Sequence, residues 1–242
     1  MIRVEKLSKS FNGRQVLRDI SLAVEEGELL AIMGSSGGGK TTLLKCISGL
    51  IPYDNGKVEI EGVSVADEPD KARTMMGMVF QSAALFDYLN VRDNILFGVR
   101  RLQRPSKADE ERLLQELLEK VDLVGYEELM PAELSGGMRK RVGLARAIAT
   151  KPKVLLYDEP TTGLDPISTY TVDELMVKTS RSEGIASIVV SHDLVSVRRI
   201  ASKVAFLEQG EITYYGDTEG FVNSDREAIR DLVQKSERHT FL

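Results

Sequence analysis

The hydrophobic and polar positions near the N-terminus alternate as they do in strands with one buried face. Two such segments, residues 2–11 and 15–24, flank Asn12-Gly13, a dipeptide that favours a tight hairpin turn. Further along, short runs of consecutive apolar residues predict strands that are buried on both faces. These runs are residues 29–33, 76–80, 154–157 and 185–190. Strands are also expected at residues 57–60, 204–207 and 212–215.

The pattern changes between residues 87 and 151, where strand signals are few and helical periodicity takes over. Ser106 lies three positions before Asp109, a spacing typical of a capped helix N-terminus. Apolar residues then recur at helical spacing and give this helix one apolar face. They are Leu113, Leu114, Leu117, Leu118 and Val121. Ser135 would cap a second helix, whose buried side would carry Met138, Val142, Ala145, Ile148 and Ala149.

A further helix is expected near the C-terminus. Ser224-Asp225-Arg226-Glu227 has the form of a capping box, in which Ser224 would cap the helix. Apolar residues follow at helical spacing and predict a packed face; they are Ala228, Ile229, Leu232 and Val233. The chain ends in Phe241-Leu242, which would either fray or dock on a partner.

With 242 residues, the chain is long enough for one α/β domain with an insertion. We expect a core of residues 1–86 and 152–222, a helical subdomain of residues 87–151 and a helical tail of residues 223–242. The net charge of -5 does not favour binding to nucleic acid. No apolar run approaches the ~18 residues of a membrane-spanning helix, and the N-terminus does not resemble a signal peptide. The single cysteine, Cys46, is expected to be buried, and fits a reducing, cytosolic compartment.

Residues 34–42 carry the clearest chemical signal. Gly34, Gly39, Lys40 and Thr41 occupy the fixed positions of the P-loop pattern G-x-x-x-x-G-K-[ST]. The glycines let backbone N–H groups approach a polyphosphate, Lys40 would reach its β- and γ-phosphates, and the Thr41 hydroxyl would ligate Mg²⁺. A buried strand before the loop and a helix after it supply the context that a phosphate site requires. The nucleotide-binding loop is therefore expected to be Gly34-Ser35-Ser36-Gly37-Gly38-Gly39-Lys40-Thr41-Thr42.

Polar side chains also stand at the ends of other predicted buried strands. Asp158 would hold Mg²⁺, and its neighbour Glu159 points elsewhere, so that it can polarise an attacking water. His192 follows another buried strand and would stand at the same ligand-binding edge of the sheet, although a lone histidine is more often structural. Gln81 ends a strand and is placed to approach ligand and metal, unless it is an ordinary loop residue.

Two further features are less specific. Phe11 lies at the end of the first strand, where it would either stack on an adenine ring or pack in a core. Two glycines follow Ser135 at a predicted helix start, and this helix end would be a second anion-binding site. Ser-Gly-Gly is also a common loop sequence, so the motif is weak evidence when taken alone.

These motifs, in this order, resemble the ATPase subunits of ATP-binding cassette (ABC) transporters over essentially the whole chain. The resemblance implies an α/β fold, with a RecA-like P-loop NTPase core, an antiparallel β subdomain and an inserted α-helical subdomain. It implies that Phe11 stacks on adenine and that Gln81 contacts Mg²⁺ and the attacking water. It also implies that Glu159 is the catalytic glutamate, that Asp165 is the D-loop aspartate and that His192 contacts the γ-phosphate.

The same resemblance implies a head-to-tail dimer as the active unit. The P-loop of one copy and the Ser135-Gly136-Gly137 helix end of the other would enclose each ATP, with Mg²⁺ held by Thr41, Gln81 and Asp158. Hydrolysis would open the dimer, and the helical subdomain would pass this motion to a transmembrane permease. The chain would then be peripheral, on the cytoplasmic face of the inner (plasma) membrane.

Met138 departs from the usual family signature, which has glutamine at this position. Leu-Ser-Gly-Gly-Met resembles the signature of ATPases that serve MCE-domain (mammalian cell entry) lipid-transport systems, such as the Mla phospholipid system. The same ATPases are also resembled by three further segments, which are residues 80–86, residues 90–95 and the short tail. This resemblance implies phospholipid transport, with an MCE-domain lipid-binding protein and a small accessory subunit as partners.

Three alternatives differ in their partners. An importer ATPase for amino acids or another small solute shares every ATP motif of this chain. A soluble ABC-type ATPase acting on DNA or ribosomes would usually carry long coiled-coil insertions or two cassettes, and neither is found in this sequence. A P-loop kinase would need neither the Ser135 helix end nor dimerisation.

Overall fold

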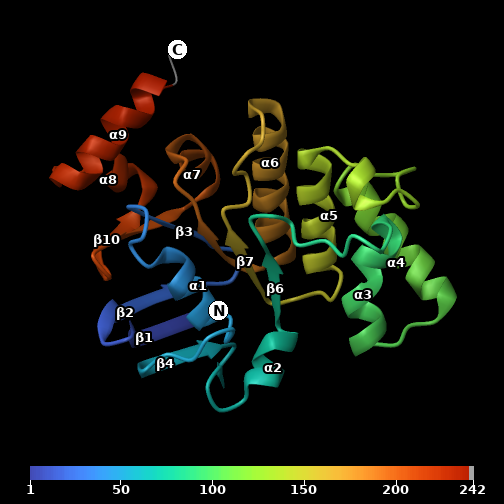
Figure 1. Ribbon diagram of the computed structural model, residues 1–242, viewed down its shortest axis with the longest axis horizontal. Coiled ribbons are helices and arrows are strands. Elements are labelled where there is room, and N and C mark those ends of the chain that lie inside the picture. The colour runs from blue at the N-terminus through green and yellow to red at the C-terminus, as the bar shows by residue number, and fades with distance from the viewer. Residues whose placement is uncertain (240–242) are drawn as a thin grey trace.

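The computed structural model describes residues 1–239, and a six-stranded sheet lies at its centre (Figure 1). The strand order is β10-β9-β3-β8-β7-β6. The strands are β3 (Leu29–Gly34), β6 (Met76–Val79), β7 (Val154–Asp158), β8 (Ala186–Val190), β9 (Lys203–Glu208) and β10 (Glu211–Asp217). Neighbouring strands pair in parallel, except that β10 is antiparallel to β9. The carboxyl ends of the parallel strands therefore meet at one edge, as the sequence predicts.

A second, antiparallel sheet has the order β2-β1-β4-β5. Its strands are β1 (Ile2–Phe11), β2 (Arg14–Val24), β4 (Asn55–Ile60) and β5 (Val63–Ser64), at the lower left of Figure 1. The predicted hairpin is confirmed, because Phe11 pairs with Arg14 and both Asn12 and Gly13 have positive φ. Positive φ at both central residues is typical of a type I′ hairpin turn, whose backbone twist matches that of the flanking strands.

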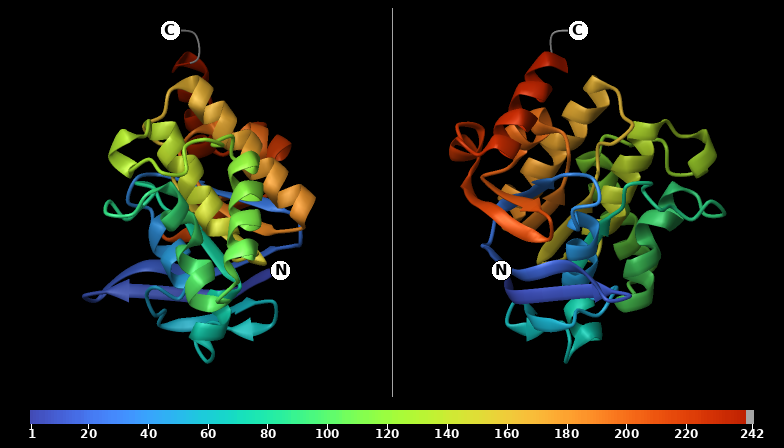
Figure 2. Two further views of the ribbon diagram at one scale, coloured as in Figure 1. Left: turned by 90° about the vertical axis from the view of Figure 1, so that its right-hand side faces the viewer. Right: turned by 60° about the vertical axis from the view of Figure 1, so that its left-hand side comes forward.

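Each face of the central sheet packs in a different hydrophobic core. In β3, Leu30 and Ile32 join the core formed with α1 (Lys40–Ile47), α2 (Pro69–Thr74) and the antiparallel sheet. Ala31 and Met33 point to the opposite face, because successive strand side chains alternate. There they join the core formed with the helices described below and with α6 (Pro166–Glu183) and α7 (Leu194–Ile200). Figures 1 and 2 show how these helices are arranged around the sheet. Among the described residues, no helix combines the length and the apolar character that a membrane crossing requires.

Helices fill the chain between β6 and β7. They are α3 (Val91–Leu102), α4 (Lys107–Lys120), the short 3-10 helix η1 (Pro131–Glu133) and α5 (Gly136–Ile148). Both predicted caps are confirmed: the Ser106 hydroxyl accepts from the Asp109 N–H at 3.2 Å, and the Ser135 hydroxyl accepts from the Met138 N–H at 3.2 Å. A cap of this kind satisfies one of the free N–H groups of a helix start.

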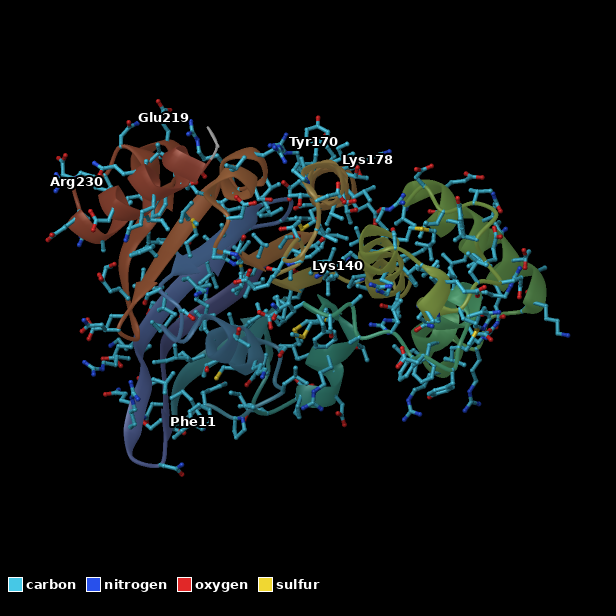
Figure 3. All side chains as sticks on the ribbon, turned by 45° about the horizontal axis from the view of Figure 1, so that its top comes forward. Phe11, Lys140, Tyr170, Lys178, Glu219 and Arg230 are labelled. Atoms are coloured by element: carbon cyan, nitrogen blue, oxygen red, sulfur yellow. The ribbon has the colours of Figure 1, made fainter. Side chains whose placement is uncertain are left out.

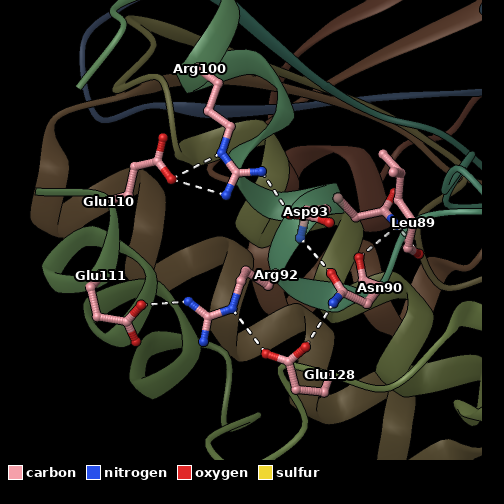
Figure 4. A network of polar contacts seen from close by, with 9 residues as sticks. Leu89, Asn90, Arg92, Asp93, Arg100, Glu110, Glu111 and Glu128 are labelled. Atoms are coloured by element: carbon pink, nitrogen blue, oxygen red, sulfur yellow. Dashed lines mark hydrogen bonds and ion pairs between the residues drawn. The ribbon is translucent and has the colours of Figure 1, made fainter. Parts of the chain in front are cut away.

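Ion pairs join α3 to α4 and to the loop before η1 (Figure 4). Arg92 binds Glu111 at 2.5 Å and Glu128 at 3.1 Å, and Arg100 binds Asp93 at 2.6 Å and Glu110 at 3.0 Å. Glu110 and Glu111, two acidic residues of α4, thus have partners on α3. Exposed pairs stabilise a fold by only ~0.2–1 kcal/mol each, so this network mainly fixes how the two helices lie.

The C-terminal helices are α8 (Thr218–Val222) and α9 (Glu227–His239). The predicted capping box is wrong, because the Ser224 N–H donates to the Phe221 carbonyl and α9 begins only at Glu227. The apolar face of α9 is confirmed, since Ile229 and Val233 are buried in the core. The predicted role of Phe241-Leu242 lies outside the described residues.

Candidate active site

The P-loop connects the end of β3 to the start of α1. Gly34 has φ 147°, and a Cβ atom there would lie 2.0 Å from the Leu207 carbonyl oxygen. Gly39 has φ 101°, and a Cβ atom there would lie 2.9 Å from Leu17 Cδ2. Both positions therefore require glycine, for conformation and for space. The close packing holds the loop at the N-terminus of α1, where backbone N–H groups are available to a phosphate.

The Lys40 ammonium lies inside the curve of this loop. It donates to the carbonyl oxygens of Gly34 at 3.0 Å and Ser35 at 2.9 Å. Burial lowers the pKa of Lys40, while the carboxylates of Glu159 and Asp158 act in the opposite direction. The amine is thus held close to the two acidic groups at the end of β7, at the place where a polyphosphate would need a positive charge.

Thr41 and Asp158 meet although 117 residues separate them. The Thr41 hydroxyl donates to Asp158 Oδ1 at 3.2 Å. Burial raises the pKa of Asp158; the Thr41 hydrogen bond and the lysines of the site lower it, and Glu159 raises it. A nearby divalent cation would favour the charged carboxylate.

This arrangement fits Mg²⁺ bound together with a nucleotide. Mg²⁺ prefers oxygen ligands and is usually held by one or two protein groups plus substrate phosphates. Thr41 and Asp158 supply two such oxygens, which lie 3.2 Å apart. Within residues 1–239, no cluster of three or more His, Cys, Asp or Glu side chains could hold a metal ion by itself.

Glu159 follows Asp158 directly but has different partners. Its Oε2 accepts from the Thr162 hydroxyl at 2.9 Å and lies 2.6 Å from His192 Nδ1. Its backbone has φ 50°, and its N–H donates to the Val190 carbonyl of β8. A left-handed conformation is uncommon for glutamate and turns the side chain away from that of Asp158. The prediction that the two carboxylates point in different directions is confirmed.

These groups surround a cleft of about 350 Å³. It is lined by Val16, Ser36, Gly37, Gly39, Lys40, Thr41, Thr42, Gln81, Glu159 and His192. Gly34, Ser35 and Gly38 belong to the same loop, and Asp158 bonds to Thr41. The structure thus brings most of the predicted residues together at the carboxyl edge of the central sheet.

Sequence reasoning missed Val16 and Thr162. Val16 lies at the start of β2, and its contact with the cleft depends on the hairpin folding over the P-loop, which no local pattern reveals. Thr162 holds Glu159. A hydroxyl three residues after a glutamate is a usable signal, because such spacing often allows a local side-chain hydrogen bond.

Other predicted residues lie away from this cleft. Phe11 is 45% exposed near the tip of the hairpin, with the Lys9 ammonium 5.1 Å from its ring centre (Figure 3). Asp165 caps α6, accepting from the N–H groups of Ile167 and Ser168 at 3.0 Å. Gly137, which follows Ser135 and Gly136 at the start of α5, approaches Ser168 of α6. The start of α5 therefore lies against α6. The roles predicted for these residues in nucleotide binding remain predictions.

A parallel α/β core, a P-loop at the end of β3 and a carboxylate pair at the end of β7, two strands away in the same sheet, define a P-loop NTPase. A sequence profile described as "ABC transporter" matches residues 17–162. The chain belongs to the ABC transporter family, as an ATPase that uses ATP and Mg²⁺. Its fold is that of an ABC ATPase cassette.

Several known proteins are similar over nearly the full chain. The glutamine transport ATP-binding protein GlnQ of Escherichia coli (strain K12) is 37% identical, over 97% of this chain and 99% of that protein. TRIGALACTOSYLDIACYLGLYCEROL 3, a chloroplastic protein of Arabidopsis thaliana, is 35% identical over 98% of this chain and 74% of its own length. The solved dimeric structure of MJ0796, a bacterial ABC transporter cassette, has a TM-score of 0.82 and 30% identity, covering 91% of this chain and 100% of that one. Other relatives are named as glutamate and methionine transport proteins.

Proposed function

We propose that this chain is the ATPase subunit of a membrane transporter, and that two copies act head to tail. The observation that carries this proposal is the convergence of Lys40, Thr41, Asp158, Glu159 and His192 at one edge of the sheet. The start of α5 at Ser135 lies outside the cleft lining, so in a dimer it would be free to serve the partner's nucleotide. MJ0796, which has the same fold, was solved as a dimer.

Each side chain of the site has a part in this proposal. Lys40 would leave the loop carbonyls and bind the terminal phosphates, and Thr41 with Asp158 would hold Mg²⁺, with Gln81 as a further ligand. When bound, Mg²⁺ neutralises phosphate charge as the phosphoryl group transfers. Glu159 would accept a proton from the attacking water. His192 holds the Glu159 carboxylate at 2.6 Å and is close enough to the cleft to contact the γ-phosphate.

Lys40→Ala should therefore lose affinity for ATP, because it removes the only charged side chain of the P-loop itself. Unchanged binding of a fluorescent nucleotide would contradict the P-loop assignment.

Phe11 would stack on the adenine, and Asp165, Ser135, Gly136 and Gly137 would meet the nucleotide across the dimer interface.

The proposed cargo is an amino acid or another small solute, because the relatives named for glutamine, glutamate and methionine transport support an importer. Their names support this cargo better than the phospholipid implied by the resemblance to the Mla system. One observation keeps phospholipid transport as a second candidate: Met138 replaces the usual signature glutamine. The name of the Arabidopsis relative contains that of a galactolipid, which supports a lipid as the class of cargo.

The partners follow from the cargo. An importer would pair this ATPase with a transmembrane permease and a solute-binding protein. A lipid system would add an MCE-domain protein and a small accessory subunit to the permease. In both cases the chain would lie on the cytoplasmic face of the inner (plasma) membrane.

The test is to purify a tagged copy from gently solubilised native membranes and to identify its companions by mass spectrometry. A permease with a solute-binding protein supports the importer. A permease with an MCE-domain protein and bound phospholipid supports the second candidate and rejects the first. Recovery with ribosomes or DNA and without a permease would overturn the transporter proposal.

A further inference from the structure

Lys140 is a buried lysine outside the residues that line the cleft. It lies on α5, on the helix that starts at Ser135, and only 6% of it is exposed. Figure 3 shows it in the interior, between α5 and the central strands. A buried ammonium is costly unless its donors are satisfied, so its partners identify what this charge is for.

Both hydrogen-bond partners of Lys140 are backbone carbonyls at the ends of strands. Its Nζ donates to the carbonyl oxygen of Gln81, after β6, and to that of Glu159, after β7, at 3.4 Å. These two residues lie 59 and 19 positions away in the sequence. One side chain of α5 therefore connects the backbone of the proposed water-contacting glutamine to that of the catalytic glutamate.

The backbone has an uncommon conformation at one of these contacts and close to the other. Glu159 has φ 50°, and two residues close behind Gln81, Ala83 and Ala84, have φ 61° and 46°. Non-glycine residues in this region are disfavoured and persist only where their surroundings hold them. Carbonyl contacts from a fixed donor are the kind of restraint that such segments require.

The same face of α5 restrains the loop after Gln81 at two more points. Arg146 donates to the carbonyls of Ala83 and Ala84, both at 2.8 Å. Between the two cations, a Cβ atom on Gly143 would lie 3.4 Å from the Ala83 carbonyl oxygen, so the helix and the loop are in close contact. Lys140, Gly143 and Arg146 recur at helical spacing and form one face. Of the two cations, only Lys140 also reaches Glu159.

We propose that Lys140 is a positioning residue for ATP hydrolysis, which ties the backbones of Gln81 and Glu159 to α5 so that the Glu159 carboxylate stays aimed at the cleft. Since α5 also carries the Ser135 helix end, a shift of this helix would move the hydrolytic residues of the same chain. The inference rests on the proposed function. It assigns to Lys140 an effect on turnover that is separate from nucleotide binding.

The test compares full-length variants by steady-state hydrolysis of MgATP and by binding of a fluorescent ATP analogue. Lys140→Met keeps an unbranched side chain that is one atom shorter and removes its donors. We expect kcat to fall at least about 10-fold, because small misplacements of catalytic groups are costly. Nucleotide affinity should stay within about 3-fold, because the P-loop contacts are untouched. Lys140→Arg, which restores charge and donors, should recover part of the lost kcat.

Two variants on the same helix serve as matched controls. Arg141 also donates to backbone carbonyls, those of Val121 and Asp122 at 2.8 Å, but away from the site. Arg141→Met should keep kcat within about 2-fold. Arg146→Met removes restraint from the loop after Gln81 without touching Glu159, and we expect a smaller loss of kcat than for Lys140→Met. Thermal unfolding of every variant shows whether a loss reflects folding.

Three results would overturn the inference. One is an unchanged kcat for Lys140→Met. Another is that Lys140→Met and Arg141→Met both lose kcat in proportion to their loss of unfolding temperature, since that indicates a structural role only. A third is absence of rescue by Lys140→Arg when that variant is fully folded. If the unsubstituted chain hydrolyses no ATP, both the proposed function and the role of Lys140 are rejected. If the unsubstituted chain hydrolyses ATP and Lys140→Met does so equally well, only the positioning role of Lys140 is rejected.

Discussion

At the scale of single residues, burial decides which reactive groups take part in chemistry. Cys46 faces the core beneath the P-loop helix and has no exposed surface, so the prediction that it serves packing is confirmed. Burial raises the pKa of its thiol to about 11; the nearby charge of Lys9 lowers it and that of Asp54 raises it. A thiol held neutral in this way is a poor nucleophile.

This pKa predicts a pH-dependent contribution to stability. The folded state keeps the Cys46 proton up to about pH 11, whereas the unfolded chain releases it near 9.0. The thiol's contribution is therefore complete below the unfolded pKa and is lost as pH rises through the folded pKa. Between pH 8 and 11, the free energy of unfolding should fall by roughly 2 kcal/mol more for the natural chain than for Cys46→Ala. Urea unfolding of both across this range measures the difference, and parallel pH curves would contradict it.

At the scale of elements, a buried carboxylate joins two helices that start at predicted functional residues. Asp173 of α6 has no exposed surface and accepts from the Ser196 hydroxyl at 2.5 Å and from Arg199 at 2.7 Å, both on α7. Burial raises the pKa of Asp173, and its partners on α7 lower it. Asp165 precedes α6, and His192 lies just before α7. The contacts of Asp173 with α7 therefore fix how the N-terminal ends of these two helices lie relative to each other.

Removing this carboxylate should be costly, because Arg199 and Ser196 would lose their buried partner. Asp173→Ala is expected to lower the free energy of unfolding by roughly 3 kcal/mol. Glu174→Ala, at the exposed neighbouring position, is the control and should change it by less than about 0.5 kcal/mol. Chemical denaturation of the three chains gives the comparison. Equal stability of both variants would show that the α6–α7 contact does not depend on this pair.

At the scale of the whole molecule, one chain carries two helix N-termini that are predicted to bind anions, and the two do not line the same cleft. The P-loop lines the cleft, while Ser135 caps α5 against α6. A second copy would bring the two kinds of site together around each nucleotide. Assembly would then depend on bound ATP, because charge on the phosphates would link the two surfaces.

Glu159→Gln should expose this assembly. The amide cannot accept the proton of the attacking water, so turnover should fall by at least about 100-fold, while ATP still binds. We expect the molar mass of this variant in light scattering after size exclusion to double with MgATP. Chelation of Mg²⁺ or the additional change Lys40→Ala should return it to the monomer. A monomer in every condition would argue against the sandwich for the isolated subunit.

The sequence by itself determined the local parts of this protein. The P-loop is contiguous, so its glycines, Lys40 and Thr41 identify it without any tertiary contact. The hairpin at Asn12-Gly13 and the caps at Ser106 and Ser135 were predictable for the same reason, since each depends on neighbours within a few residues. The capping box at Ser224 failed because Phe221, in the preceding helix, takes the N–H that the box needs.

Only the tertiary structure decided which distant groups meet. The bond from Thr41 to Asp158 spans 117 positions, and the contact of His192 with Glu159 spans 33. Sequence could place these groups at strand ends, yet their partners depend on the strand order of the sheet. Lys140 lies on a helix whose pattern predicts its apolar side. The carbonyls that hold its ammonium belong to the loops after β6 and β7, and they come within reach because α5 packs against β6. Hydrophobic periodicity records which face of an element is buried; it does not record what lies opposite that face.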